Sequence, residues 1–189
     1  MWSAVAGTWI AYTALLALLQ FIIYPAVTAP WQLRASGIAA GLVVTAGCLV
    51  LARRVVADFH ARPWQWLVGI GCVVAGSAVR IVALDLSWAA ALAQVSFYVL
   101  AVGLPEETLF RGVIWRQLEA VLDRKVWVLL VNSALFGLSH LPALVSQHSP
   151  LWILATLSLV GAVFGLVRAC GGSIPLLAGI HVGWDLVQF

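Results

Sequence analysis

"WSAVAGTWIAYTALLALLQFIIYPAVTAPWQL", residues 2–33, contains no charged side chain. A helix needs about 20 predominantly apolar residues to cross a bilayer, because its backbone polar groups must pair within the segment. The most continuous part of this stretch, residues 3–25, is therefore predicted to span a membrane. It is too long for a signal peptide and lacks the basic region that opens one, so we expect the span to be retained.

The composition extends this prediction to the whole chain. Of its 189 residues, 63% are hydrophobic and 9% are charged, whereas soluble domains carry about 25% charged residues. Six further apolar runs follow the first, at residues 35–52, 64–84, 86–105, 126–145, 150–168 and 172–188. Together they predict an all-α, polytopic membrane bundle of about seven transmembrane helices, forming one domain over residues 1–189.

Basic residues gather in three of the regions that flank the predicted spans. They are Arg53, Arg54, Arg62, Arg111, Arg116, Arg124, Lys125 and Arg168. With seven spans, all three regions fall on one side of the membrane, and short cytoplasmic loops are enriched in Lys and Arg. We therefore expect a cytoplasmic N-terminus and an outer C-terminus, in a bacterial inner (plasma) membrane. The net charge of +3 then follows from topology, and the chain needs no nucleic-acid partner.

A few polar residues stand apart from this pattern. Arg80 falls inside the third span, where it either extends to the outer interface or pairs with Asp85. Cys48, Cys72 and Cys170 have no CxxC spacing, so neither a disulfide framework nor a cysteine metal site is indicated.

Ionisable side chains within membrane spans are costly and point to function. Three segments carry them: "LPEETLFRG" at residues 104–112, "NSALFGLSH" at 132–140 and "HVGWD" at 181–185. The first also has a purely structural explanation. The two glutamates after Pro105 can begin an interfacial amphipathic helix, "TLFRGVIWRQLEAVL", because acids are favoured in a first helical turn.

The other two segments have structural explanations as well. His140 can be a buried histidine bonded to the backbone, to Ser139 or to Asn132, which shares its helix face. His181 and Asp185, one turn apart, can form a local polar pair. All three segments together are harder to explain in this way, because each could have been wholly apolar.

Buried polar groups need partners, and these groups can supply one another across a shared cavity. We expect five side chains to converge: Glu106, Glu107, His140, His181 and Asp185. Glu107 and Arg111 lie four residues apart in the order that favours a helical ion pair. Glu106 points about 100° away around the same helix. It is therefore the carboxylate expected to act as a general base.

Convergence places a condition on depth in the membrane. Counted from the predicted cytoplasmic boundaries, His140 lies about 21 Å deep and His181 about 14 Å deep, whereas Glu106 lies near the surface. The boundaries must therefore shift. A fourth span that begins near residue 92 would draw Glu106 and part of "TLFRGVIW" into the membrane, and the fifth span can begin after residue 126.

The same segments resemble known motifs: "EETLFR" an EExxxR motif, "FGLSH" an FxxxH motif and "HVGWD" an HxxxN/D motif. In this order on membrane helices, they are similar to those of the CAAX protease and bacteriocin-processing family of intramembrane proteases. The resemblance covers residues 106–185 and leaves the first three spans without a matching motif. It implies an endopeptidase that cleaves a membrane-embedded or lipid-anchored protein or peptide tail. Family analogy offers prenylated C-terminal tails, leader peptides and, as in myxosortase-like members, C-terminal sorting helices.

The resemblance also implies a role for each residue. Glu106 corresponds to the essential glutamate, and Glu107 with Arg111 to its supporting pair. His140 corresponds to a catalytic partner that helps Glu106 to deprotonate a water molecule. His181 would donate to the developing oxyanion.

Asp185 fits the N/D position of the third motif, but well-studied members of the family carry Asn there, whose amide can help to stabilise an oxyanion. An ionised Asp cannot donate a hydrogen bond, so Asp185 is either protonated or accepts a hydrogen bond from His181.

The family also carries a metalloprotease label, for which the zinc ligands would be Glu106, His140 and His181. The sequence has no HExxH motif, and we favour a metal-free glutamate protease. Two other functions remain open. One is a catalytically silent immunity or scaffold protein of the same family. The other is a proton-coupled transporter, although neither repeats nor paired broken helices are found.

Overall fold

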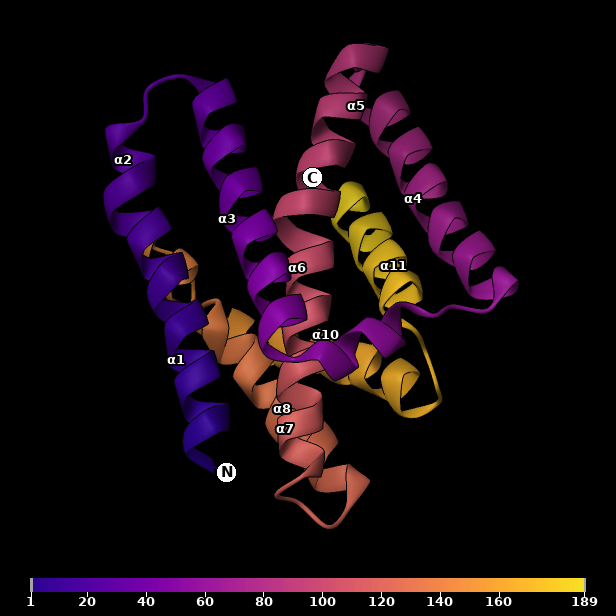
Figure 1. Cartoon of the computed structure of the whole chain (residues 1–189). Coiled ribbons are helices and arrows are strands. Elements are labelled where there is room, and N and C mark those ends of the chain that lie inside the picture. Colours follow the sequence, from indigo (N-terminus) through magenta and orange to yellow (C-terminus); the bar gives the residue numbers. More distant parts are fainter. Residues whose placement is uncertain (1, 189) are drawn as a thin grey trace. The chain divides into compact units, whose positions relative to one another are not determined.

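The structure, a computed structural model, describes residues 2–188 apart from the side chains of Leu51 and Arg54. Every regular element in this part of the chain is a helix, as Figure 1 shows. Within residues 2–188, five helical segments are long and apolar enough to cross a membrane: Trp2–Ala26, Pro30–Val50, Pro63–Leu84, Trp88–Glu119 and Lys125–Ser146. Two shorter apolar helices, Ile153–Ala169 and Ile174–Val187, follow at the positions of the sixth and seventh predicted spans. The predicted all-α, multi-pass membrane fold is confirmed.

The contacts group the chain into two compact units, and each is described by itself. The first unit contains the residues up to Ser36 and Val113–Cys170, and the second contains Gly37–Gly112 and the residues from Gly171 onward. The single domain over residues 1–189 therefore stays a prediction.

The first unit is built on the packing of two helices, α8 and α10. Its elements are α1 (Trp2–Leu18), the π-helical η1 (Leu19–Ile23), α2 (Tyr24–Ala26), α7 (Trp115–Glu119), α8 (Lys125–Ser139), α9 (Leu141–Ser146) and α10 (Ile153–Ala169). Gly137 lets α8 approach α10 closely, since a Cβ there would lie 2.8 Å from the carbonyl oxygen of Leu154. On the other side, the indole of Trp9 on α1 donates a hydrogen bond to the Leu135 carbonyl at 2.9 Å.

The second unit holds most of α3 (Pro30–Leu51), the 3₁₀-helical η2 (Arg53–Phe59), α4 (Pro63–Leu84), α5 (Trp88–Phe97) and α11 (Ile174–Val187). Between α5 and α7 the chain runs through the π-helical η3 (Tyr98–Gly103), α6 (Leu104–Glu107) and the π-helical η4 (Thr108–Ile114). In this unit α11 packs along α4 and also contacts η3 and α6. Figure 1 shows α4 and α11 next to each other.

Glycines bring α4 and α11 into backbone contact. A Cβ at Gly179 would lie 2.4 Å from the Cα of Gly69, and one at Gly76 would lie 2.6 Å from the carbonyl oxygen of Gly183. Helices in a membrane associate through such close van der Waals packing of small residues. Because Gly69 meets Gly179 and Gly76 meets Gly183, the two helices run parallel and contact each other at both glycine pairs.

Pro105 does not begin a helix. It lies inside one continuous helical segment, Trp88–Glu119, so the interfacial helix predicted from Pro105 onward is the continuation of the fourth span. The wider π-helical turn of η3 precedes Pro105, and the backbone N–H of Leu104 bonds to the Val99 carbonyl. Such π-helical turns interrupt an α-helix without ending it. After the proline, the Thr108 hydroxyl donates to the Leu104 carbonyl at 2.6 Å.

The third predicted span contains Arg80, whose partner differs from the one that the sequence suggested. Arg80 donates hydrogen bonds to the Gln94 side chain and to the carbonyls of Leu186 and Gln188, rather than pairing with Asp85. Asp85 instead ends α4 in the left-handed conformation, with φ of 48°.

Candidate functional site

Two carboxylate side chains and an arginine side chain lie close together on one helical segment. Glu106 and Glu107 are on α6, and Arg111 follows one turn later in η4. The side chains of Glu107 and Arg111 are fully buried, and Arg111 Nη1 lies 3.1 Å from Glu107 Oε1. The predicted helical ion pair is therefore present. Glu106 is 8% exposed, so the segment also carries this glutamate into the buried part of the molecule.

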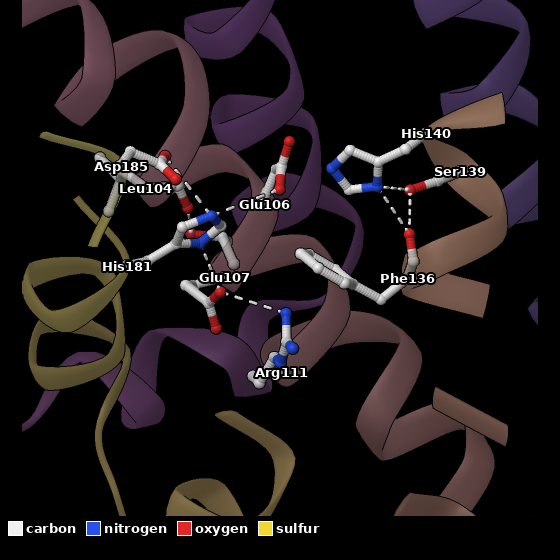
Figure 2. A network of polar contacts seen from close by, with 10 residues as sticks. Leu104, Glu106, Glu107, Arg111, Phe136, Ser139, His140, His181 and Asp185 are labelled. Carbon is white, nitrogen blue, oxygen red and sulfur yellow. Dashed lines mark hydrogen bonds and ion pairs between the residues drawn. The ribbon is translucent and has the colours of Figure 1, made fainter. Parts of the chain in front are cut away.

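His181 on α11 lies among the carboxylates. Its Nδ1 is 2.8 Å from Glu107 Oε1, and its Nε2 is 3.9 Å from Glu106 Oε2 and 3.6 Å from Asp185 Oδ2. Figure 2 shows these contacts as dashed lines that meet at the imidazole. The second unit thus brings together four of the five side chains expected to converge: Glu106, Glu107, His181 and Asp185.

The contact with Glu107 fixes the orientation of the imidazole. A carboxylate oxygen at 2.8 Å accepts a hydrogen bond, so Nδ1 of His181 carries the proton. Nε2 is then directed at Glu106 and Asp185. The Glu107 carboxylate accepts hydrogen bonds from both Arg111 and His181. It is therefore the group that holds the cluster together. Glu106 and Asp185 lie at ion-pair distance from Nε2.

The local pair predicted for His181 and Asp185 exists at 3.6 Å, but it is longer than the contact with Glu107. His181 is therefore held mainly by a residue 74 positions away in the chain. Asp185 is less enclosed than the other members of the cluster, with 19% of its side chain exposed.

His140 belongs to the first unit and is described with it. It follows the last residue of α8, and its Nδ1 lies 2.9 Å from the Phe136 carbonyl oxygen and 3.4 Å from Ser139 Oγ. Since the carbonyl can only accept, Nδ1 carries the proton and Nε2 is the acceptor nitrogen. The Phe136 ring meets the imidazole edge to face, with the ring centroids 5.0 Å apart. The convergence of His140 with the carboxylates stays a prediction.

The sequence analysis left open a zinc site as an alternative to a metal-free mechanism. Among residues 2–188, no group of three or more His, Cys, Asp and Glu side chains is arranged to hold a metal ion. Nδ1 of His181 is also committed to Glu107. The zinc site with Glu106, His140 and His181 as ligands and the metal-free alternative both stay predictions.

An apolar cavity of about 470 Å³ lies in the second unit. Its lining comes from η2, α4, η3, α6 and α11 and includes Trp66, Ile70, Val74, Leu104 and Val182. Leu104 lies two residues before Glu106, and Val182 follows His181. The cavity thus shares two of its helices, α6 and α11, with the carboxylate cluster.

The sequence analysis did not single out the glycines of α11 or Thr108. The glycines of "GIHVG", residues 179–183, are a small-xxx-small pattern that predicts close helix packing, and they were a usable signal. The contact of Thr108 with Leu104 carried no such signal, because a threonine inside an apolar helix is common.

Residues 87–187, slightly more than half of the chain, match the model of the type II CAAX prenyl endopeptidase Rce1-like family. The matched range contains all three motif segments and begins at the fourth span. Searches of curated proteins and of solved structures gave no significant match.

Proposed function

The chain belongs to the type II CAAX prenyl endopeptidase Rce1-like family, and from this premise we propose that it hydrolyses a peptide bond in a membrane-associated protein or peptide tail. Membership of this family supports the activity of a multi-pass intramembrane endopeptidase. The observation that carries the finer proposal is the position of His181 against Glu106, Glu107 and Asp185.

In the proposed reaction, Glu106 is the general base. Its carboxylate takes a proton from a water molecule whose oxygen attacks the carbonyl carbon of the scissile peptide bond. The tetrahedral intermediate then collapses as the carbon–nitrogen bond breaks, and the proton on Glu106 passes to the departing amine. The products are a carboxylate and an amine, and Glu106 returns to its starting form.

His181 is proposed to stabilise the oxyanion of the intermediate. Because Nδ1–H is donated to Glu107, the hydrogen bond to the oxyanion requires a second proton on Nε2. The charge of the resulting imidazolium is balanced by Glu107 and by Asp185, whose oxygen lies 3.6 Å from Nε2. On this account Asp185 acts as an acceptor that keeps the ring in place, at a position where well-studied members of the family carry Asn.

His140 is assigned as the catalytic partner of Glu106 by the family resemblance. Its Nδ1–H donates to the Phe136 carbonyl, so Nε2 has the lone pair that such a partner needs. A substrate with an apolar chain, such as a prenylated tail or a sorting helix, suits the apolar cavity that adjoins α6 and α11.

The proposed activity is tested with the purified protein in proteoliposomes and three quenched-fluorescence peptides: a farnesylated CAAX tail, a leader peptide and a C-terminal sorting helix. We expect at least one to be cleaved, and we expect Glu106→Gln to lower kcat by at least about 10³-fold, since the base is lost without a change of shape. Glu119→Gln is the matched control, because Glu119 is exposed and bonds only locally to Trp115. Equal cleavage by Glu106→Gln and the unaltered chain would contradict the mechanism, and no cleavage of any peptide would contradict the activity.

Metal dependence has a separate test. A metal-free reaction predicts that a chelator leaves the cleavage rate unchanged. A loss of activity that zinc restores would instead favour a zinc site formed by Glu106, His140 and His181.

A further inference from the structure

Arg80 lies on the face of α4 that meets α11. Gly69, Gly76 and Arg80 are seven and four residues apart, so they follow one stripe of the helix. Gly69 and Gly76 contact the backbone of α11 at Gly179 and Gly183. Arg80 comes one turn further along and meets the C-terminal end of the same helix.

The guanidinium group supplies hydrogen bonds that α11 lacks. Arg80 Nη1 donates to the carbonyl of Gln188 at 2.9 Å and to that of Leu186 at 3.3 Å. The last carbonyls of a helix have no partner within the helix, and a positive charge there interacts favourably with the helix dipole. The last turn of α11 carries no basic residue of its own. Arg80 therefore caps α11 from a neighbouring helix.

Arg80 also binds the other helical segment that carries the cluster. Its Nε donates to the Gln94 side chain on α5, and its Cζ lies 5.7 Å from the centre of the Tyr98 ring. The segment that contains Gln94 and Tyr98 continues without a break to Glu106 and Glu107. One side chain thus ties the end of α11 to the helix that bears the glutamates.

This link bears on the direction in which His181 and Asp185 point. Each lies two residues from Gly183, which is about 200° around an α-helix. Since Gly183 faces α4, His181 and Asp185 face the opposite way, where His181 meets Glu107 and Asp185 meets the His181 imidazole. A rotation or slide of α11 along α4 would change the contacts of His181 directly.

We propose that Arg80 is a positioning residue for hydrolysis: by capping α11 and holding it to α5, it fixes His181 and Asp185 against Glu106 and Glu107. This inference rests on the proposed function for its effect on cleavage. The partners of Arg80 are Gln94, Tyr98, Leu186 and Gln188, none of which belongs to the cluster, so it acts through α11. An arginine suits the task because its planar fork donates in several directions at once, whereas a lysine has a single ammonium group.

The test compares four variants in proteoliposomes with whichever peptide the unaltered chain cleaves. Arg80→Met removes the hydrogen bonds and keeps an apolar stem, Arg80→Lys keeps the charge, and Gln94→Leu releases only the arm to α5. Arg34→Met, at an exposed arginine on α3, is the control for losing one positive charge. In parallel, the imidazole ¹⁵N signals of His181 are recorded, assigned by comparison with His181→Gln.

We expect Arg80→Met to lower kcat about 10- to 100-fold with KM changed less than about two-fold, since a misplacement of about 1 Å can cost 10²-fold. We expect the His181 signals of Arg80→Met to shift. The kcat values and signals of Arg80→Lys and Gln94→Leu should lie between those of Arg80→Met and the unaltered chain. Arg34→Met should match the unaltered chain. Unchanged kcat and unchanged His181 signals in Arg80→Met would overturn the inference. The inference would also be overturned if kcat and KM changed by the same factor in Arg80→Met and if Arg80→Lys showed the same change.

The proposed function and the positioning role of Arg80 can be contradicted independently of each other. If the unaltered chain cleaves none of the peptides, the proposed function fails, and the His181 signals of the Arg80 variants still decide whether Arg80 positions the imidazole. If Arg80→Met does not fold, Arg80→Lys and Gln94→Leu supply the same two readings, and a normal kcat with unshifted signals in both overturns the inference.

Discussion

At the scale of single residues, Glu106 and Glu107 are adjacent in sequence and have different surroundings. Glu107 is fully buried between Arg111 and His181, with contacts of 3.1 and 2.8 Å. Glu106 approaches His181 only to 3.9 Å. Glu107 is therefore suited to hold the cluster together, and Glu106 is suited to act as the reacting carboxylate.

Arg111→Met should therefore destabilise the protein, because it leaves the buried Glu107 carboxylate without its main positive partner. Breaking a buried ion pair in this way costs about 3 to 5 kcal/mol. The free energy of unfolding, measured by titration with a denaturing detergent, checks the value. Glu106→Gln is the comparison and should leave this free energy within about 1 kcal/mol of the unaltered chain. Equal stability of the two variants would show that the pair does not hold the fold.

His140→Gln tests the residue that the resemblance assigns as the catalytic partner. The substitution removes the acceptor nitrogen, and we expect kcat to fall at least about 10²-fold while the protein remains folded. Ser139→Ala is the control, because it removes a neighbouring hydroxyl that bonds to the Phe136 carbonyl and keeps the imidazole. A variant at His140 with normal kcat would remove this residue from the mechanism.

Residue spacing predicted some of these contacts and missed others for a physical reason. The pair of Glu107 and Arg111 follows from helix geometry, since residues four apart are neighbours on one face. The same rule predicted Asp185 as the partner of His181, but the shorter contact is with Glu107. That contact joins two helices, and its formation depends on how α11 packs, which no local pattern specifies.

At the scale of elements, the interface between α4 and α11 determines where His181 lies. Gly179→Ala places a Cβ 2.4 Å from the Cα of Gly69, so the helices must separate. We expect a loss of about 1 to 3 kcal/mol in the free energy of unfolding, typical of overpacking, together with a lower kcat.

Gly71→Ala is the matched control on α4, because nothing lies within 4 Å of a Cβ at that position. It should leave both stability and kcat close to those of the unaltered chain. If both alanine variants behave alike, close packing at Gly179 is not what positions α11.

Helix boundaries were the weakest part of the sequence prediction at this scale. Pro105 after Gly103 was compatible with a helix start, yet the segment is helical from Trp88 to Glu119. The reason is the π-helical turn at Tyr98–Gly103, which accommodates the proline and leaves no trace in hydropathy. The helix begins at Trp88 and continues to Glu119, and the shift of the fourth span that convergence requires stays a prediction.

At the scale of the whole molecule, hydropathy was sufficient to predict the class of fold and the order of the apolar helices. Long uncharged runs predict helices because the bilayer leaves the backbone no other partner. It was not sufficient to predict which helices pair, since α4 and α11 are separated by about 90 residues and both are apolar.

The predicted orientation can be tested with Cys170, a free and exposed cysteine that follows Arg168 at the expected cytoplasmic end of α10. A membrane-impermeant maleimide should label Cys170 in inverted membrane vesicles and should not label it in right-side-out vesicles. Cys170→Ser shows which part of the labelling comes from Cys170, because Cys48 is buried but Cys72 is partly exposed. Labelling only in right-side-out vesicles would reverse the topology and place the N-terminus outside.

The π-helical turns of η3 and η4 have a consequence for how sequences of this kind are compared. Each turn holds about one residue more than an α-helical turn, so it acts as a one-residue insertion that rotates all following side chains by about 100°. Deletion of one residue within Tyr98–Gly103 would leave every letter of "EETLFR" intact while turning both glutamates away from His181. A chain can therefore keep all three motifs and still lose the angular phase that makes them one site, and the count of residues before a motif carries as much information as the motif itself.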